Sequence, residues 1–441
     1  MKVMISLSNR LMQRYMPDPY VLVVILTFLV GGLALLLTPS TPVQLLSFWG
    51  DGFWSLLTFS MQMVFIVVTG HVMASSPFFK KLLGNLASVP KSPGQAIILV
   101  TLVALVACWI NWGFGLIIGA LLAREIAKKV DGVDYRLLVA SAYSGFIIWS
   151  GGLSSSVALT IATPGHFTEN LIGVVPTSQT LFSPLNLIIV VGLIILVPII
   201  NRIMTPTKDQ AFIIDRSLLE DTNAMPAATV DNVEMTPADR LENSKILSLL
   251  IGLTGLAFLG YYIATNGFAI NLNIINFLFL IVGILLHKTP KLFLEAVTNS
   301  VKSATGIIIQ FPFYAGLMGI VTASGLASVL SDAFISISNE HTFHMLTLWS
   351  AGLVNFFVPS GGGQWAVQAP VMLEAAQSLG VSLPKTAMAV AWGDAWTNMI
   401  QPFYALPALA IAGLKAKDIM GYGLIIMLIT GIFISAAFLF I

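Results

Sequence analysis

Long uninterrupted apolar runs constrain this chain of 441 residues more than any other feature of its sequence. A run of roughly 18 or more apolar residues with few charges is typical of a helix that crosses a membrane. The clearest runs lie at residues 20–37, 53–73, 246–263, 270–286 and 419–441, with a shorter one at 187–200. Charged residues make up only 9% of the chain, whereas soluble domains contain about 25%. The sequence therefore predicts an all-α polytopic membrane protein.

The remaining composition argues against several classes of protein. A net charge of +1 gives no support for a nucleic-acid partner, and the single cysteine, Cys108, cannot build a disulfide framework. Neither a His-Glu-x-x-His nor a Gly-x-Ser-x-Gly motif occurs. We therefore predict a protein that is not an enzyme and has no catalytic residue, metal centre or cofactor, with Na⁺ as the one candidate bound ion. The basic first 18 residues lack a cleavage-site pattern, so we expect no cleaved signal peptide.

The connections between the apolar runs are alternately rich and poor in Lys and Arg, and this pattern indicates how the chain is oriented in the membrane. Basic residues concentrate in the cytoplasmic connections of membrane proteins. The connections that are poor in Lys and Arg, and that we therefore place outside, are residues 38–52, 164–183, 266–271 and 338–344. This assignment puts the N-terminus in the cytoplasm and the C-terminus outside, with Lys385 as the one exception.

Two apolar stretches are too short to cross the membrane twice, although each must begin and end on one side. Residues 96–126 start and end inside and contain Asn-Trp-Gly-Phe-Gly at 111–115. Residues 346–376 start and end outside and contain Pro-Ser-Gly-Gly-Gly at 359–363. Irregular backbone at membrane depth is tolerated only where protein or water covers it. We therefore predict about nine transmembrane helices plus two re-entrant hairpins whose tips line a cavity.

The chain divides into two halves that resemble each other. Residues 205–242 are rich in Asp, Glu, Thr and Pro and predict a cytoplasmic linker between repeat 1 (1–204) and repeat 2 (243–441). The matched segments, offset by about 245–250 residues, are 61–70 with 309–319, Asn111 with Asn355, and 132–145 with 380–394. The predicted topology inverts one repeat relative to the other. Inverted repeats with broken helices that meet at mid-membrane are typical of secondary transporters.

Each half also contains an irregular stretch after its hairpin, at residues 143–156 and 392–402. We interpret both as unwound segments of a spanning helix, although Gly and Ser are also common in tight helix packing. Freed N–H groups, helix ends, hydroxyls and amides suit a small carboxylate. The candidate substrate-binding residues are Asn111, Gly113, Gly115, Ser154, Ser155, Ser156, Asn355, Ser360, Gly361, Gly362, Gly363, Gln364, Asn398 and Gln401. Gln62 and Gln310 are weaker candidates, since single polar groups often join helices within a bundle.

Asp394 is the one acidic side chain that the predicted spans place well inside the membrane. Intramembrane carboxylates are costly and usually functional, so we interpret Asp394 as the site that coordinates Na⁺ or carries a proton. A structural role, in which Asp394 bonds Thr397 or Asn398, stays open. The first half has no acidic counterpart. The candidate cation-coupling residues are Asp394, Ser144, Gly145 and Gly393.

Seven short motifs resemble the bacterial short-chain fatty acid transporter family, and they follow one another over essentially the whole chain. They are MPDP (16–19), WGDGFW (49–54), INWGFGL (110–116), HKTP (287–290), QFPFYAG (310–316), VPSGGGQW (358–365) and QPFYALPALAIAGL (401–414). The resemblance implies an inner-membrane carrier for acids such as acetoacetate or butyrate, within the wider ion transporter superfamily. It also implies inverted repeats and, in many relatives, elevator motion and dimers. The hairpin tips depart from the Ser-Asn-Thr signature of the Na⁺-coupled carboxylate carriers in that superfamily.

Residues and resemblance together favour a secondary active transporter of small monocarboxylates that works by alternating access with Na⁺ or H⁺ coupling. Its expected partners are then the carboxylate, the cation and membrane lipid, and we expect no nucleic-acid partner. A homodimer is compatible with the resemblance. The expected location is a bacterial inner membrane, with the C-terminus in the periplasm. The alternatives are a carrier of a dicarboxylate or an aminobenzoyl-type acid on the same scaffold and, with less support, an intramembrane enzyme or a channel.

Overall fold

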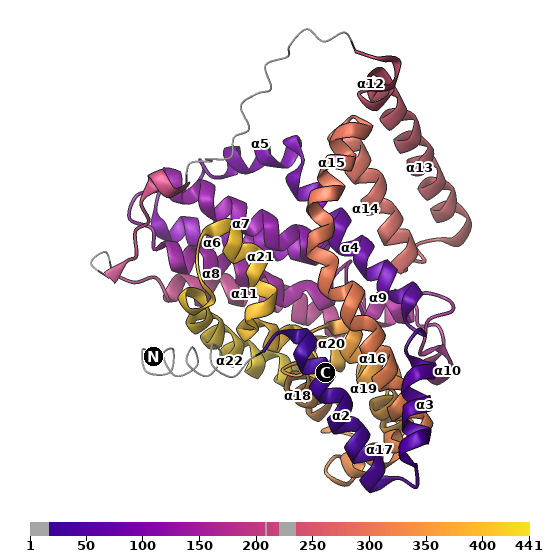
Figure 1. Ribbon diagram of the computed structural model, residues 1–441. Helices are drawn as coiled ribbons and strands as arrows, with labels where there is room; N and C mark the ends of the chain where they lie inside the picture. Colours follow the sequence, from indigo (N-terminus) through magenta and orange to yellow (C-terminus); the bar gives the residue numbers. More distant parts are fainter. Residues whose placement is uncertain (1–16, 208–209, 220–234) are drawn as a thin grey trace.

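The computed structural model describes residues 17–207, 210–219 and 235–441, and this part of the chain is helical without a strand (Figure 1). The basic N-terminal residues that we expect in the cytoplasm lie outside the described residues, as does much of the predicted linker. Seven helices in the described part are long and apolar enough to cross a membrane. The prediction of an all-α polytopic membrane protein is confirmed. The expected count of nine spans also requires shorter helices and stays a prediction.

From residue 17, where the described part starts, the first half begins with six helices, of which α6 and α7 form a tightly packed pair. They are α2 (Pro19–Leu37), α3 (Pro42–Gly52), α4 (Leu57–Ser75), α5 (Pro77–Leu86), α6 (Pro93–Ile110) and α7 (Trp112–Lys129). Four of them begin with a proline that follows a capping Asp, Ser or Thr, a combination that favours helix starts. A single residue, Asn111, separates α6 from α7. The predicted first hairpin therefore exists as two antiparallel helices with a one-residue turn.

The helix that follows this hairpin is broken. Helix α8 (Tyr135–Ser144) passes directly into the 3₁₀ helix η1 (Gly145–Gly151), and a run of turns separates η1 from α9 (Ala158–Ile161). The irregular stretch expected at residues 143–156 is present from Gly145 onward, and its place within a membrane-spanning helix stays a prediction. The half ends with α10 (Glu169–Ile172), η2 (Thr177–Gln179) and α11 (Pro184–Ile203). Of the predicted linker, the described part contains η4 (Arg216–Leu219) and α12 (Pro237–Glu242).

The second half repeats this order of elements after one additional helix, α13 (Lys245–Asn266). Next come α14 (Leu272–His287), α15 (Pro290–Val301), η5 (Lys302–Ala304), α16 (Thr305–Ala323) and α17 (Leu326–Ser336). The second hairpin is α18 (Phe343–Val354) and α19 (Gly361–Ser378), and the second broken helix is α20 (Leu383–Thr397), η6 (Asn398–Ile400) and α21 (Pro402–Ala412). The chain ends with α22 (Ala416–Phe440).

Equivalent elements of the two halves are separated by a nearly constant distance along the chain. The paired first residues, 248 to 250 positions apart, are Leu57 and Thr305, Pro93 and Phe343, Trp112 and Gly361, and Tyr135 and Leu383. The same register pairs Asn111 with Ser360, because each residue caps the second helix of its hairpin. The expected pairing of Asn111 with Asn355 describes the other end of the turn, since each residue is the C-terminal cap of the first helix of its hairpin and the turn of the second hairpin is longer. This order of elements supports a repeat, and its inverted orientation stays a prediction.

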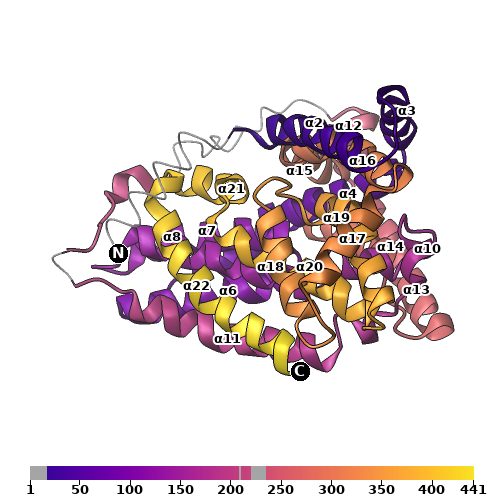
Figure 2. The ribbon, with the colours of Figure 1, turned by 90° about the horizontal axis from the view of Figure 1, so that it is seen from below.

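The two halves interleave in space. In Figures 1 and 2, α2 and α3 lie beside α16 of the second half, whereas α7, α8 and α11 lie beside α21 and α22. Both broken helices run through the interior, because nearly every residue of α8–η1 and of α20–η6 is buried. Their irregular backbone is therefore covered by protein, as membrane depth requires.

Candidate functional site

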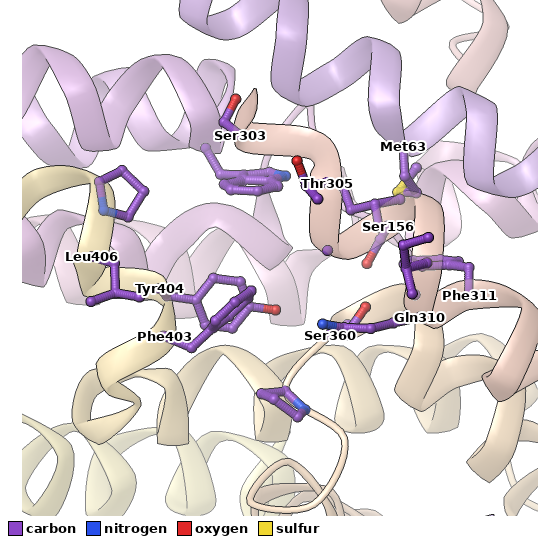
Figure 3. Close-up of a pocket in the computed structure, with 18 of the residues that line it drawn as sticks. Met63, Ser156, Ser303, Thr305, Gln310, Phe311, Ser360, Phe403, Tyr404 and Leu406 are labelled. Carbon is purple, nitrogen blue, oxygen red and sulfur yellow. The ribbon is translucent and has the colours of Figure 1, made fainter. Parts of the chain in front are cut away.

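A cavity of about 460 Å³ lies where elements of both halves meet. Helices α4 and α7 and the η1 region supply one wall, and α16, the tip of α19 and α21 supply the other. Figure 3 shows Ser156, Gln310, Ser360 and the hydroxyl of Tyr404 converging on this space from four separate elements. The apolar part of the lining includes Met63, Trp112, Leu116, Trp149, Phe311 and Phe403. The cavity therefore combines aromatic and aliphatic walls with a small polar cluster.

The polar end of the cavity is the N-terminus of α19. Ser360 caps this helix, and its Oγ accepts a hydrogen bond of 3.3 Å from the N–H of Gly363. The N–H groups of Gly361 and Gly362 extend beyond the helix end, where no helical carbonyl can accept them, and that of Gly361 donates to the hydroxyl of Tyr404. Such a helix end favours an anion through its free donors and its dipole.

Each of the three glycines at this tip packs closely against a different neighbouring side chain. A Cβ built on Gly361 would lie 2.7 Å from the Oγ of Ser156, and one on Gly362 would lie 2.5 Å from a ring carbon of Phe59. A Cβ on Gly363 would lie 2.5 Å from the ring of Tyr314. Each position therefore excludes a side chain for a reason of packing. The run of glycines lets the helix end approach the opposite wall of the cavity.

Two buried donors in the cavity wall lack a protein partner. The hydroxyl of Ser156 and the indole N–H of Trp149 make no hydrogen bond, although both residues line the cavity and are at most 3% exposed. Buried polar groups are otherwise almost always hydrogen-bonded. Unpaired donors beside a free helix N-terminus point to an anionic ligand rather than to a cation.

The predicted residues of the first hairpin have structural partners and are absent from the cavity lining. The Nδ2 of Asn111 donates to the carbonyl of Ile66 at 3.0 Å, and its Oδ1 accepts from the N–H of Phe114 at 2.9 Å. Gly113 packs on the backbone of α4, and Gly115 packs on Cys108 across the hairpin. These contacts fasten the tip of the first hairpin to α4. A role of this tip in binding substrate stays a prediction.

The serines after η1 divide into two groups. Ser154 accepts a hydrogen bond of 2.9 Å from the N–H of Trp112, and Ser155 accepts one of 3.2 Å from the N–H of Ala158. Both side chains therefore stabilise the local backbone, whereas Ser156 faces the cavity. Adjacent serines in an irregular segment have no periodicity that could have separated these roles.

The other predicted site residues gather around Asp394, in a second cluster that does not line the cavity. The Oδ2 of Asp394 accepts from Asn398 at 3.2 Å, which agrees with the structural role left open above. Asn355 donates to the carbonyl of Asp394 at 3.0 Å and to the Oδ1 of Asn398 at 2.6 Å. Gln401 donates to the carbonyl of Asn355 at 2.9 Å, and Gln364 donates to that of Ala351 at 2.8 Å. We refer to Asn355, Gln364, Asp394, Asn398 and Gln401 as the amide cluster.

The remaining candidates for cation coupling have packing or hydrogen-bonding roles. A Cβ on Gly145 would lie 2.5 Å from the backbone of Ala104 in α6, and Gly393 packs as closely against α18. The Oγ of Ser144 accepts a hydrogen bond of 2.8 Å from Asn201. Gly145 and Gly393 therefore let each broken helix press against the first helix of its hairpin.

Four cavity residues were missed or undervalued by sequence reasoning: Tyr404, Trp149, Gln310 and Lys302. Gln310 was expected to join helices, as Gln62 does through its 2.7 Å bond to Asn273 in α14. Lys302 lies exposed at the break between α15 and α16, within the cavity lining. Tyr404 lies two residues after the proline that starts α21, within one of the seven family motifs, and that motif was the only available signal.

Three comparisons place this molecule among known proteins. A crystal structure of the Alcanivorax borkumensis YdaH transporter, described as having an unusual topology, matches with a TM-score of 0.52 over 95% of this chain and 98% of that chain. Its sequence identity is 18%, so the likeness shows the fold alone. A protein of Escherichia coli K12 that is named for short-chain fatty acid transport is 47% identical, over 96% of each chain. One of Haemophilus influenzae with the same name is 44% identical, over 97% of this chain and 98% of the relative.

The apolar helices and the cavity between the two halves fit the class of multi-pass membrane transporters. The family model described as "Short chain fatty acid transporter" matches residues 1–441. This chain belongs to that family, which confirms the resemblance drawn from the seven motifs. Because the family is one of transporters, the prediction that the protein is not an enzyme is also confirmed.

Proposed function

We propose that this protein carries short-chain monocarboxylates such as butyrate or acetoacetate across the bacterial inner membrane by secondary active transport. The unpaired donors of Ser156 and Trp149, facing the free N-terminus of α19, are the observation that carries the proposal. They offer several donors to one carboxylate. The short apolar tail then lies against Trp112 and Phe403.

The charges around this cavity suit a substrate with one carboxylate group better than a substrate with two. Lys302 is the one cationic side chain among the described residues that line the cavity, and it is exposed. A second carboxylate at the apolar end would be desolvated without a partner, which is costly. This charge balance favours a monocarboxylate over the dicarboxylate that we considered as an alternative substrate.

The positions of Lys302 and Asp18 support a proposal about the side of the membrane to which the cavity opens. Both are exposed and both line the cavity. The distribution of basic residues places both on the cytoplasmic side, with the N-terminus, while the C-terminus is periplasmic. On this orientation, the cavity opens to the cytoplasm. Alternating access would expose the same cavity to the periplasm, and Na⁺ or H⁺ would drive the cycle through Asp394.

Competition for uptake tests the proposed substrate class. Liposomes that contain the purified protein are loaded with unlabelled butyrate. The entry of radiolabelled butyrate from outside is then measured as counterflow. We expect unlabelled acetate, butyrate and acetoacetate to inhibit counterflow, and succinate and 4-aminobenzoyl-glutamate to have no effect at the same concentration. Inhibition by succinate alone would contradict the proposal. A conductance without counterflow would indicate a channel.

A further inference from the structure

Gln310 of α16 is a buried amide that points into the substrate cavity and has no partner in the protein. It is 6% exposed and lines the cavity, and Figure 3 shows it converging on this space with Ser360 and Tyr404. Within the described part of the chain, its side chain makes no hydrogen bond. Buried side-chain polar groups are otherwise nearly always hydrogen-bonded. The amide is therefore available to a ligand in the cavity.

The counterpart of Gln310 in the first half does have a protein partner. The register that relates the two halves pairs Gln62 of α4 with Gln310 of α16. Helix α14 packs against α4, and there Gln62 donates to the Oδ1 of Asn273 at 2.7 Å. Helix α2 packs against α16 in the same way, but its residue at the position of Asn273 is Ile25. Because isoleucine has no hydrogen-bonding group, Gln310 does not take the helix-joining role that Gln62 has.

The other uncharged polar side chains on this wall of the cavity are used by the protein itself. Ser303 donates to the carbonyl of Ser300, and Thr305 donates to the carbonyl of Lys302. Both hydroxyls therefore stabilise the backbone where α15 passes through η5 into α16. Among the described residues of η5 and α16 that line the cavity, Gln310 is the uncharged side chain left to hydrogen-bond a ligand.

The amide of Gln310 lies at the apolar end of the cavity. A Cβ built on Gly306, one turn earlier in α16, would lie 3.3 Å from the Nε2 of Gln310 and 3.4 Å from the Cζ of Phe403. The amide and the aromatic ring therefore lie against the same face of α16. The unpaired donors proposed to hold the carboxylate meet instead at Gly361. An acid bound by those donors has its carboxylate at Gly361 and its chain beside Gln310.

A neutral amide at this place distinguishes acids by the atoms of their chains. A ketone oxygen can accept a hydrogen bond from Nε2, and a hydroxyl can also donate to Oε1, because no bond within the protein fixes the amide of Gln310. An aliphatic chain covers the amide and excludes water without offering a partner, which weakens binding. Sites that hydrogen-bond a substrate oxygen discriminate strongly against analogues that lack this oxygen.

We propose that Gln310 is a specificity-determining residue that hydrogen-bonds a neutral oxygen on the substrate chain, so that the carrier favours short oxo- and hydroxy-acids over aliphatic acids of the same length. This inference rests on the proposed function and names a class within its monocarboxylates. Gln310 differs in its role from the donors at Gly361, which act on the carboxylate that all these acids share.

Inhibition of butyrate counterflow by acids of equal length tests the role of Gln310. The probes are unlabelled butyrate, 3-hydroxybutyrate and acetoacetate, which have the same number of carbons and one carboxylate each. For the wild-type protein we expect the inhibition constants of the two oxygenated acids to be about tenfold below that of butyrate. Gln310→Met keeps the length of the side chain but removes the amide. It should weaken inhibition by the oxygenated acids about tenfold and leave inhibition by butyrate equal or stronger.

Gln62→Met is the matched control, because it makes the same change at the counterpart of Gln310, outside the cavity lining. We expect it to leave the ratio of the inhibition constants unchanged. This ratio does not depend on the amount of folded protein in the liposomes, so a partly unfolded variant still reports the preference.

Three results would overturn the inference and leave the proposed function standing. The first is equal inhibition of the wild-type protein by all three acids, which needs no variant. The second is an unchanged ratio in Gln310→Met, and the third is an equal loss of affinity for all three acids, which would place Gln310 at the carboxylate. Absence of counterflow with every one of these acids would contradict the proposed function itself, and the inference with it.

Discussion

The hydroxyl oxygen of Ser156 lies so close to Gly361 that a Cβ on the glycine would be 2.7 Å away from it. Ser156 belongs to the unwound segment of the first half, and Gly361 begins the second helix of the second hairpin. The same Cβ would lie 2.7 Å from the ring of Trp149. The two halves therefore meet at van der Waals contact, beside the helix N-terminus proposed to bind the carboxylate. Movement of the hairpin relative to the unwound segment would open or close this contact.

Gly361→Ala should separate the hairpin tip from its partner and impair transport. The added methyl has no space unless Ser156 or Trp149 moves, and both are buried. We expect butyrate counterflow to fall at least tenfold while the protein remains folded in detergent. The matched control is Gly84→Ala in α5, where no atom lies within 4 Å of the added Cβ. Equal counterflow in both variants would show that the contact is not needed.

Ser156→Ala should change the KM for butyrate, whereas Ser155→Ala should change the thermal stability. Ser156 has an unpaired hydroxyl in the cavity, and a hydrogen bond to a charged group is worth about 1.5–3 kcal/mol. Its loss should raise the KM for butyrate about tenfold or more, with little change in thermal stability. Ser155 accepts from the N–H of Ala158, so Ser155→Ala should lower the Tm and leave KM nearly unchanged. KM from initial rates and Tm from thermal melting distinguish the two serines, and a larger KM shift in Ser155→Ala would contradict the assignment.

The hairpins show what the sequence could and could not predict. Apolar runs, helix-breaking glycines and a weak repeat were sufficient to predict both helical hairpins and both broken helices, whereas the re-entrant course of the hairpins stays a prediction. The repeat alignment found only one of the two counterparts of Asn111, because it matched Asn111 to Asn355 by residue type. In the structure Asn111 is both the turn and the cap, whereas the second hairpin divides these roles between Asn355 and Ser360. A difference in turn length is invisible when only one residue type is compared.

The site was harder to predict because its residues come from distant parts of the chain. The tip at Ser360 to Gly362 was predicted from its composition alone. Tyr404 and Trp149 were missed because an aromatic residue in a membrane helix usually packs or lies at an interface, and nothing local distinguishes a cavity wall. The separation of Ser360 from Asp394 into a cavity and an amide cluster depends on which way each side chain points. That information requires the packed structure.

Phe403→Ala should reduce the discrimination between butyrate and acetate. Phe403 lines the cavity next to Tyr404, where its ring can contact the apolar tail of the acid. Each buried CH₂ contributes about 0.8 kcal/mol, and butyrate has two more than acetate. We therefore expect the ratio of their inhibition constants in counterflow to fall by up to about tenfold. Phe357→Ala is the control, because Phe357 is 47% exposed and lies outside the cavity lining. The same change of ratio in both variants would refute a role for Phe403 in tail recognition.

Asp134→Ala should destabilise the protein, whereas Asp131→Ala, three residues earlier, should not. Asp134 is buried; its Oδ1 accepts from the N–H of Leu137 at 2.8 Å and caps α8, while its Oδ2 accepts from the N–H of Phe212 at 2.8 Å. Losing a helix cap costs about 1 kcal/mol, and the unpaired N–H of Phe212 adds about 1–3 kcal/mol.

Asp131 instead pairs with Arg216 at 2.5 Å, on the surface, where its side chain is 94% exposed. Exposed ion pairs contribute little, since solvent screens them and their side chains lose entropy. Thermal melting in detergent should therefore give a clearly lower Tm for Asp134→Ala and an unchanged Tm for Asp131→Ala. Limited proteolysis should then cut the linker near Phe212 faster in the first variant only. Equal susceptibility of both variants would contradict the larger role given to the buried carboxylate of Asp134.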